Sequence, residues 1–207
     1  MATIHQATLT PTKIELLEAW LPSRHWYPAD EAPGLHRVAA CRFDDPAGEV
    51  GLEVLVVRSG DDGPLVHVPM TYRGAPLEDG EFFLVGTMEH SVLGSRWVYD
   101  AVGDPVYIEA LTTAIRTGTG EAEEVVETPD GPQPRKSSMT LRGTGMAPAS
   151  APIGRLVRVE DGDPAVVVTE AARLDVRRVL SAEPAEGPLS LVGKWEGQPP
   201  TVLADLY

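Results

Sequence analysis

The sequence predicts an α+β fold: an antiparallel β-meander with two flanking helices, followed by a second, smaller antiparallel β region. Short β-rich runs are separated by turns of Asp, Gly and Pro, which is typical of antiparallel hairpins. Two other segments carry apolar residues at helical spacing. Nineteen prolines and twenty glycines in 207 residues favour short elements throughout.

The first helix is expected over residues 12–21. Thr12 and Glu15 have the spacing of a capping box. Pro22 ends the segment, because proline cannot continue a helix. The apolar stripe of this helix consists of Ile14, Leu17 and Leu21.

Three strand-like runs follow, at residues 35–44, 49–59 and 64–73, and they predict the meander. Val66, Val68 and Met70 alternate with His67, Pro69 and Thr71, which predicts a strand with one apolar and one polar face.

A second helix is expected over residues 106–116, with Asp104 as its N-cap and Pro105 in its first turn. Gly118 and Gly120 are expected to end it. Later runs predict a hairpin of residues 153–159 and 165–170, and then three more short strands. We therefore divide the chain into a first domain at 1–128, a Pro/Gly/Ser-rich linker at 129–152 and a β-rich subdomain at 153–207.

The net charge of −14 argues against nucleic acid and anionic membranes as partners, because both require a basic surface. Cys41 is the only cysteine, so no internal disulfide is possible and a reducing compartment is expected. No signal peptide and no apolar run long enough to cross a bilayer stand out, so the expected location is the cytoplasm.

The densest polar cluster consists of Glu89, His90, Arg96 and Asp100. A histidine beside carboxylates can act as a general base or bind a metal. Adjacent residues such as Glu89 and His90 point to opposite faces of a strand, however. The structural alternative is a polar turn held by an Arg96–Asp100 pair, with Asp104 used as a helix cap.

A second cluster, Arg24, His25, Trp26 and Tyr27, could stack on a sugar and bind its hydroxyl groups, with Trp97 as a further candidate. Packing of Trp26 and Tyr27 between the first helix and the sheet is the alternative. The remaining histidines, among them His36 and His67, lack metal-ligand spacing, and Asp161 and Asp163 read as a hairpin turn. We therefore expect no metal and no cofactor.

The aromatic turn LPSRHWY after a first helix resembles the N-terminal cap domain of bacterial maltokinases. Leu21, His25, Trp26 and Tyr27 fit the cap motif, with His25 in place of the usual arginine. The segment HSVLGSRWVYDAVGDP at residues 90–105 resembles the closing turn of the cap before its helix. The resemblance covers about residues 12–128 and implies a connection with maltose, trehalose and α-glucan metabolism.

The catalytic motifs of the kinase are absent. Phosphoryl transfer in that family requires a His-x-Asp loop, which this sequence lacks. We therefore expect a stand-alone, non-catalytic binding or regulatory protein whose partner is an α-glucan or trehalose pathway enzyme or a saccharide. Two alternatives stay open: a small glucan-active enzyme with its site around His90, Arg96 and Asp100, and a structural subunit that forms a homodimer through sheet edges.

Overall fold

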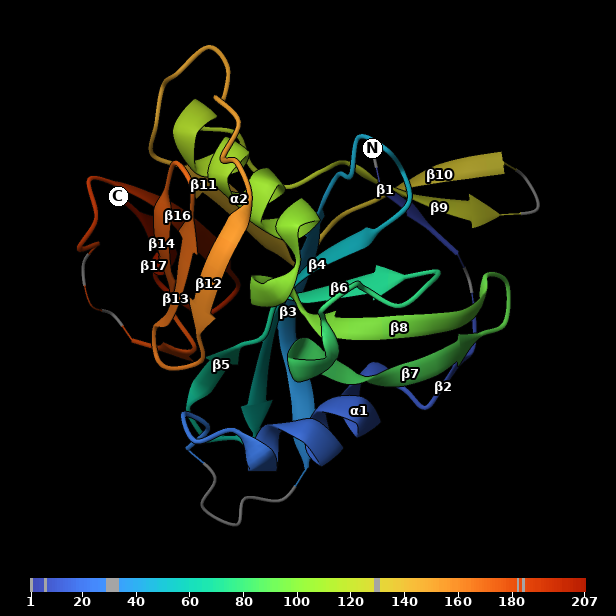
Figure 1. Cartoon of the computed structure of the whole chain (residues 1–207). Helices are drawn as coiled ribbons and strands as arrows, with labels where there is room; N and C mark the ends of the chain where they lie inside the picture. The colour runs from blue at the N-terminus through green and yellow to red at the C-terminus, as the bar shows by residue number, and fades with distance from the viewer. Residues whose placement is uncertain (1, 6, 29–33, 129–130, 182, 184) are drawn as a thin grey trace.

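A computed structural model describes residues 2–5, 7–28, 34–128, 131–181, 183 and 185–207 of the chain. Over these residues the fold consists mostly of antiparallel strands in three sheets, with two α-helices (Figure 1). This confirms the α+β class. Neither helix is long and apolar enough to cross a membrane within the described residues.

The first helix, α1 (Lys13–Trp20), begins as the sequence predicts. The Thr12 hydroxyl accepts a hydrogen bond from the Glu15 N–H at 3.2 Å, and the Glu15 carboxylate accepts one from the Thr12 N–H at 2.7 Å. This reciprocal capping satisfies two of the N–H groups left free at the helix start. A 3₁₀ turn, η1 (Leu21–Ser23), follows at Pro22.

The largest sheet is built around β4 (Gly51–Ser59). It pairs on one edge with β3 (Leu35–Phe43), and on the other edge with β5 (Leu65–His67) and β6 (Met70–Arg73). The expected third strand is thus divided in two at Pro69, because proline has no N–H for a strand ladder. The remaining members are β2 (Leu9–Thr10), β7 (Leu84–His90), β8 (Gly94–Asp100) and β15 (Val179–Leu180).

Both faces of this sheet are covered by other parts of the protein. The prediction that residues 66–71 have one polar face is therefore wrong. All six residues are buried, His67 and Thr71 included. On β4, Leu55 and Val57 belong to a core with α1, whereas Val54 and Val56 belong to a second core with α2. Strands buried on both faces read as continuous apolar runs, as β4 does.

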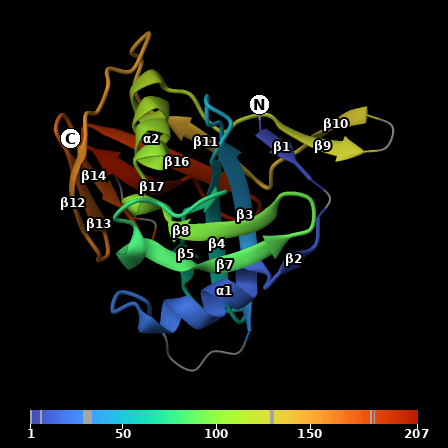
Figure 2. The ribbon, with the colours of Figure 1, turned by 45° about the vertical axis from the view of Figure 1, so that its right-hand side comes forward.

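The second helix, α2 (Pro105–Thr117), has Asp104 as its N-cap and ends at Gly118, whose φ of 71° places it in the left-handed region. In both views α2 lies between the large sheet and the C-terminal strands (Figures 1 and 2). Those strands form a six-stranded sheet in the order β11 (Met139–Gly143), β16 (Leu189–Trp195), β17 (Thr201–Leu206), β14 (Arg173–Val176), β13 (Ala165–Thr169) and β12 (Leu156–Glu160).

The segment expected as a linker contains two strands. One is β11, and the other is β10 (Gly131–Arg135), which pairs with β9 (Glu124–Thr128). The third strand of this small sheet, β1 (Ala2–Ile4), runs parallel to β9. The core that contains α2 joins residues from both expected domains, among them Val54 and Leu203. The domain boundaries themselves stay a prediction.

Candidate functional site

The polar cluster expected at Glu89, His90, Arg96 and Asp100 lies on the β7–β8 hairpin. His90 faces Gly94 and Glu89 faces Ser95 in the strand register. Arg96 and Asp100 are four residues apart on β8, which corresponds to about 13 Å along a strand. The exposed Glu89 carboxylate accepts a hydrogen bond from the Ser95 hydroxyl at 2.6 Å. The four side chains therefore do not surround one point.

His90 closes the turn of this hairpin. Its Nδ1 accepts hydrogen bonds from the N–H groups of Val92 and Leu93, at 3.2 and 3.1 Å. Desolvation and the neighbouring charges of His5 and Arg96 lower the pKa of His90. Only the neutral imidazole can accept the hydrogen bonds of both Val92 and Leu93. Its Nδ1 is therefore occupied by backbone N–H groups.

Asp100 pairs with an arginine from the other end of the chain. Its carboxylate oxygens accept bonds from Arg178 at 3.0 and 2.5 Å, and both side chains are buried. The expected Arg96–Asp100 pair is therefore wrong. Burial raises the pKa of Asp100, and the Arg178 charge acts against that rise. Asp104 caps α2 as predicted and also binds Arg73 with both oxygens, at 2.7 and 2.6 Å.

Trp26, from the aromatic cluster, is buried against the C-terminal half. Its indole N–H donates to the Asp161 carboxylate at 2.6 Å. The Arg178 guanidinium lies 4.7 Å from the ring centroid, and the Trp20 ring packs at 6.1 Å. Asp163 accepts a bond from the Arg178 N–H at 2.8 Å, so both acids of the β12–β13 turn have structural partners. Sequence reasoning missed Arg178, since nothing in its neighbourhood indicates burial.

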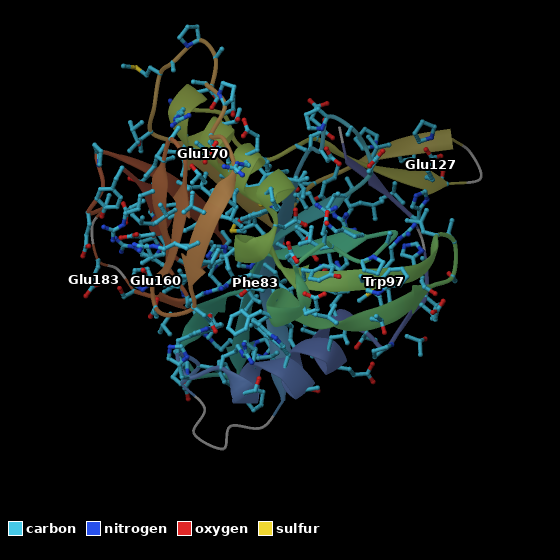
Figure 3. All side chains as sticks on the ribbon, viewed as in Figure 1. Phe83, Trp97, Glu127, Glu160, Glu170 and Glu183 are labelled. Atoms are coloured by element: carbon cyan, nitrogen blue, oxygen red, sulfur yellow. The ribbon has the colours of Figure 1, made fainter. Side chains whose placement is uncertain are left out.

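The side chains of the other aromatic-cluster residues have different surroundings. Arg24 pairs with Asp161 at 3.5 Å and lies over Trp20. His25 is exposed, and Tyr27 packs half-buried against the α1 core. Trp97 lies on β8 (Figure 3) and points to the opposite face from Arg96, because successive strand residues alternate.

The structure contains a cavity of about 570 Å³ between the large sheet and the small β1–β9–β10 sheet. His90 and Arg96 line it, together with residues of β3, β4 and β6 that the sequence did not single out. Its cationic lining residues are Lys13, Arg37, Arg42, Arg96, Arg135 and Lys136. No cluster of metal-ligating side chains is found in the described part of the chain.

Lys13, Glu53 and Tyr72 form one wall of this cavity. The Lys13 ammonium lies 2.7 Å from both Glu53 carboxylate oxygens, and the Tyr72 hydroxyl donates to the same carboxylate. Burial acts to raise the pKa of Glu53, but the charges of Lys13 and Arg42 outweigh it and lower that pKa to about 2. Glu53 is therefore ionised at neutral pH and committed to Lys13. Lys13, Glu53 and Tyr72 therefore form a fixed polar surface on this wall.

The comparisons with known proteins support one relationship. No curated protein matches the chain. The family model for the maltokinase N-terminal cap domain matches residues 20–104, a shorter range than the expected 12–128. This range runs from the end of α1 to the N-cap of α2, and it includes the first of the two segments that carry the resemblance and all but the last residue of the second. The chain is therefore similar, over residues 20–104, to the maltokinase N-terminal cap domain, as predicted.

Proposed function

We propose that this chain is a cap-like binding or regulatory module of maltose, trehalose and α-glucan metabolism, and that the cavity beside β3 and β4 is its binding site. The match to the maltokinase cap carries the proposal. Arg37, Arg42, Glu53, Tyr72 and Arg96 all lie within the matched residues and all line the cavity. Most of its charged groups thus come from the cap-like part of the chain.

The arrangement of the β7–β8 hairpin favours binding over catalysis. The His90 Nδ1 is occupied by two backbone N–H groups, and Asp100 is buried against Arg178. A general base must instead reach the proton that it removes. In keeping with the match to the maltokinase cap, the proposed partner is a saccharide. Its binding is expected to stabilise the folded protein.

A thermal-shift titration of the full chain with maltose, trehalose and glycogen tests this proposal. A ligand that binds only the folded state stabilises it by about 2.7 kcal/mol at one hundred times its Kd. We expect at least one sugar to raise Tm, and Arg96→Gln to weaken the response. Arg142→Gln, on the exposed side of β11 and outside the cavity lining, is the matched control.

Two results would count against the proposal. One is an unchanged Tm with every sugar. The other is turnover of a glucan that disappears in His90→Gln while the variant stays folded, which would support the enzyme alternative.

A further inference from the structure

The charge of the cavity is opposite to that of the protein. Acidic residues outnumber basic ones by 31 to 17 over the whole sequence. In the cavity lining, six lysines and arginines stand against five acids, Asp44, Asp45, Glu49, Glu53 and Glu124. More than a third of the basic residues of the chain are therefore gathered at one cavity.

Several of these acids are already engaged. Glu53 is bound by Lys13, and Glu124 lies 3.8 Å from Arg135. The Asp45 carboxylate accepts bonds from three backbone N–H groups of its own turn, at 2.8 to 3.0 Å. These carboxylates have little capacity left to neutralise further cations.

Four of the cations lack such a partner. Across the described residues, no carboxylate oxygen lies within 4 Å of the charged groups of Arg37, Arg42, Arg96 or Lys136. Among the described residues, the Arg96 guanidinium donates one hydrogen bond, to the Ser95 carbonyl oxygen at 3.3 Å. Their donors are therefore available to a ligand.

Arg42 is the best positioned of the four. Its half-buried guanidinium lies 5.9 Å from the Tyr72 ring centroid, and the Glu53 charge lies close by. Gly51 lies beside it, since an added Cβ would be in ordinary van der Waals contact, 3.5 Å, with an Arg42 guanidinium nitrogen. An arginine held in place in this way loses little freedom on binding an anion.

Arginine forks bind phosphate oxygens with two parallel hydrogen bonds, which makes a phosphate group the best match for these donors. A cavity of about 570 Å³ is in the usual range for a small-molecule site, so it accommodates a small phosphorylated sugar. We infer that the cavity binds a phosphomonoester of a mono- or disaccharide, with the phosphate at Arg42. The sugar part of this inference rests on the proposed function, whereas the phosphate part rests on the charges alone.

Isothermal titration of the full chain with matched pairs tests the inference. The probes are glucose and glucose 6-phosphate, trehalose and trehalose 6-phosphate, and glycerol phosphate as a phosphomonoester without a sugar ring. We expect one sugar phosphate to bind at least ten-fold more tightly than its neutral sugar, with affinity that falls as salt is added. Arg42→Gln should weaken that binding at least ten-fold, and Arg42→Lys should weaken it less. Arg142→Gln should leave it unchanged, and the Tm of each variant without ligand shows that it is folded.

The outcomes separate the two proposals. Equal affinity for a sugar and its phosphate overturns the phosphate inference and supports the proposed function. Equal affinity for glycerol phosphate and the sugar phosphates supports an anion site but contradicts the sugar specificity, and with it the proposed function. If none of the five probes binds, the phosphate inference is overturned, and the thermal-shift result with maltose, trehalose and glycogen decides the proposed function separately.

Discussion

His67 shows how far the environment of one residue can depart from its sequence pattern. The alternation along residues 66–71 placed it on a polar face, yet its exposed fraction is 1%. Its Nδ1 donates to the Arg177 carbonyl oxygen at 2.9 Å, and no described residue bonds its Nε2. Burial lowers its pKa from 6.5 to about 4. Local alternation identified the strand, but it could not indicate that α2 and the C-terminal strands cover the second face.

We predict that His67 makes the protein less stable in mild acid. The unfolded chain binds a proton at this residue near pH 6.5 and the folded chain only near pH 4, so stability rises with pH between these values. The contribution is complete above about pH 6.5 and is lost as pH falls toward 4. It amounts to about 3 kcal/mol at 1.36 kcal/mol per pKa unit.

Urea unfolding between pH 7.5 and 4.5 measures this effect. His67→Asn keeps a donor for the Arg177 carbonyl but cannot titrate, so its free energy of unfolding should depend less on pH than that of the native chain. His90 contributes with the same sign in both proteins, and the difference between them isolates His67. The exposed His36→Asn is the control. An unchanged pH slope in His67→Asn would contradict the prediction.

At the scale of elements, local signals identified both helices and most strands. Caps at Thr12 and Asp104 and the stop at Gly118 are encoded within a few residues, and the structure contains all of them. The strand β10 was missed, because its GPQPR sequence has no strand propensity and it forms only by pairing with β9. The contact between α2 and β11 could not be predicted from the sequence either. It depends on Gly143 and Gly145, which are far from the helix along the chain.

Gly143 is required for that contact, and Gly143→Ala should separate the two elements. An added Cβ would lie 1.9 Å from the Ala114 carbonyl oxygen, far inside van der Waals contact with a backbone atom. We expect a loss of about 1–3 kcal/mol in the free energy of unfolding, which is typical of overpacking in a core. Urea midpoints measure it. Gly162→Ala, whose Cβ would lie 3.3 Å from the Pro164 carbonyl oxygen at a half-buried position of the β12–β13 turn, should change the midpoint much less. Equal urea midpoints for Gly143→Ala and Gly162→Ala would contradict the prediction, because they would show that α2 can shift away from β11 without loss of stability.

At the scale of the whole molecule, one buried ion pair joins the two halves of the chain. Arg178 binds Asp100, 78 residues away in sequence, and lies over Trp26. Breaking a buried pair by removing one partner leaves an uncompensated charge and costs about 3–5 kcal/mol. We therefore predict that Arg178→Met destabilises the protein by that amount in urea unfolding.

The double variant separates charge from packing. Arg178→Met with Asp100→Leu removes both charges, so most of the lost stability should return. The exposed Arg142→Met provides the reference for a simple arginine replacement. If Arg178→Met has the same free energy of unfolding as the native chain, the ion pair does not stabilise the protein. If the double variant is no more stable than Arg178→Met, the lost stability comes from packing against Trp26.

The amino-acid sequence by itself determined the α+β class, the helix caps, the hairpins, the acidic character and the resemblance to the maltokinase cap. Each of these is carried by residues that are neighbours in the chain or by composition. Only the tertiary structure decided that Asp100 meets Arg178, that Trp26 is buried, and that cations from α1, β3, β8 and β10 surround one cavity. Such groupings depend on how sheets pack across tens of residues, and no periodicity along the chain records that packing.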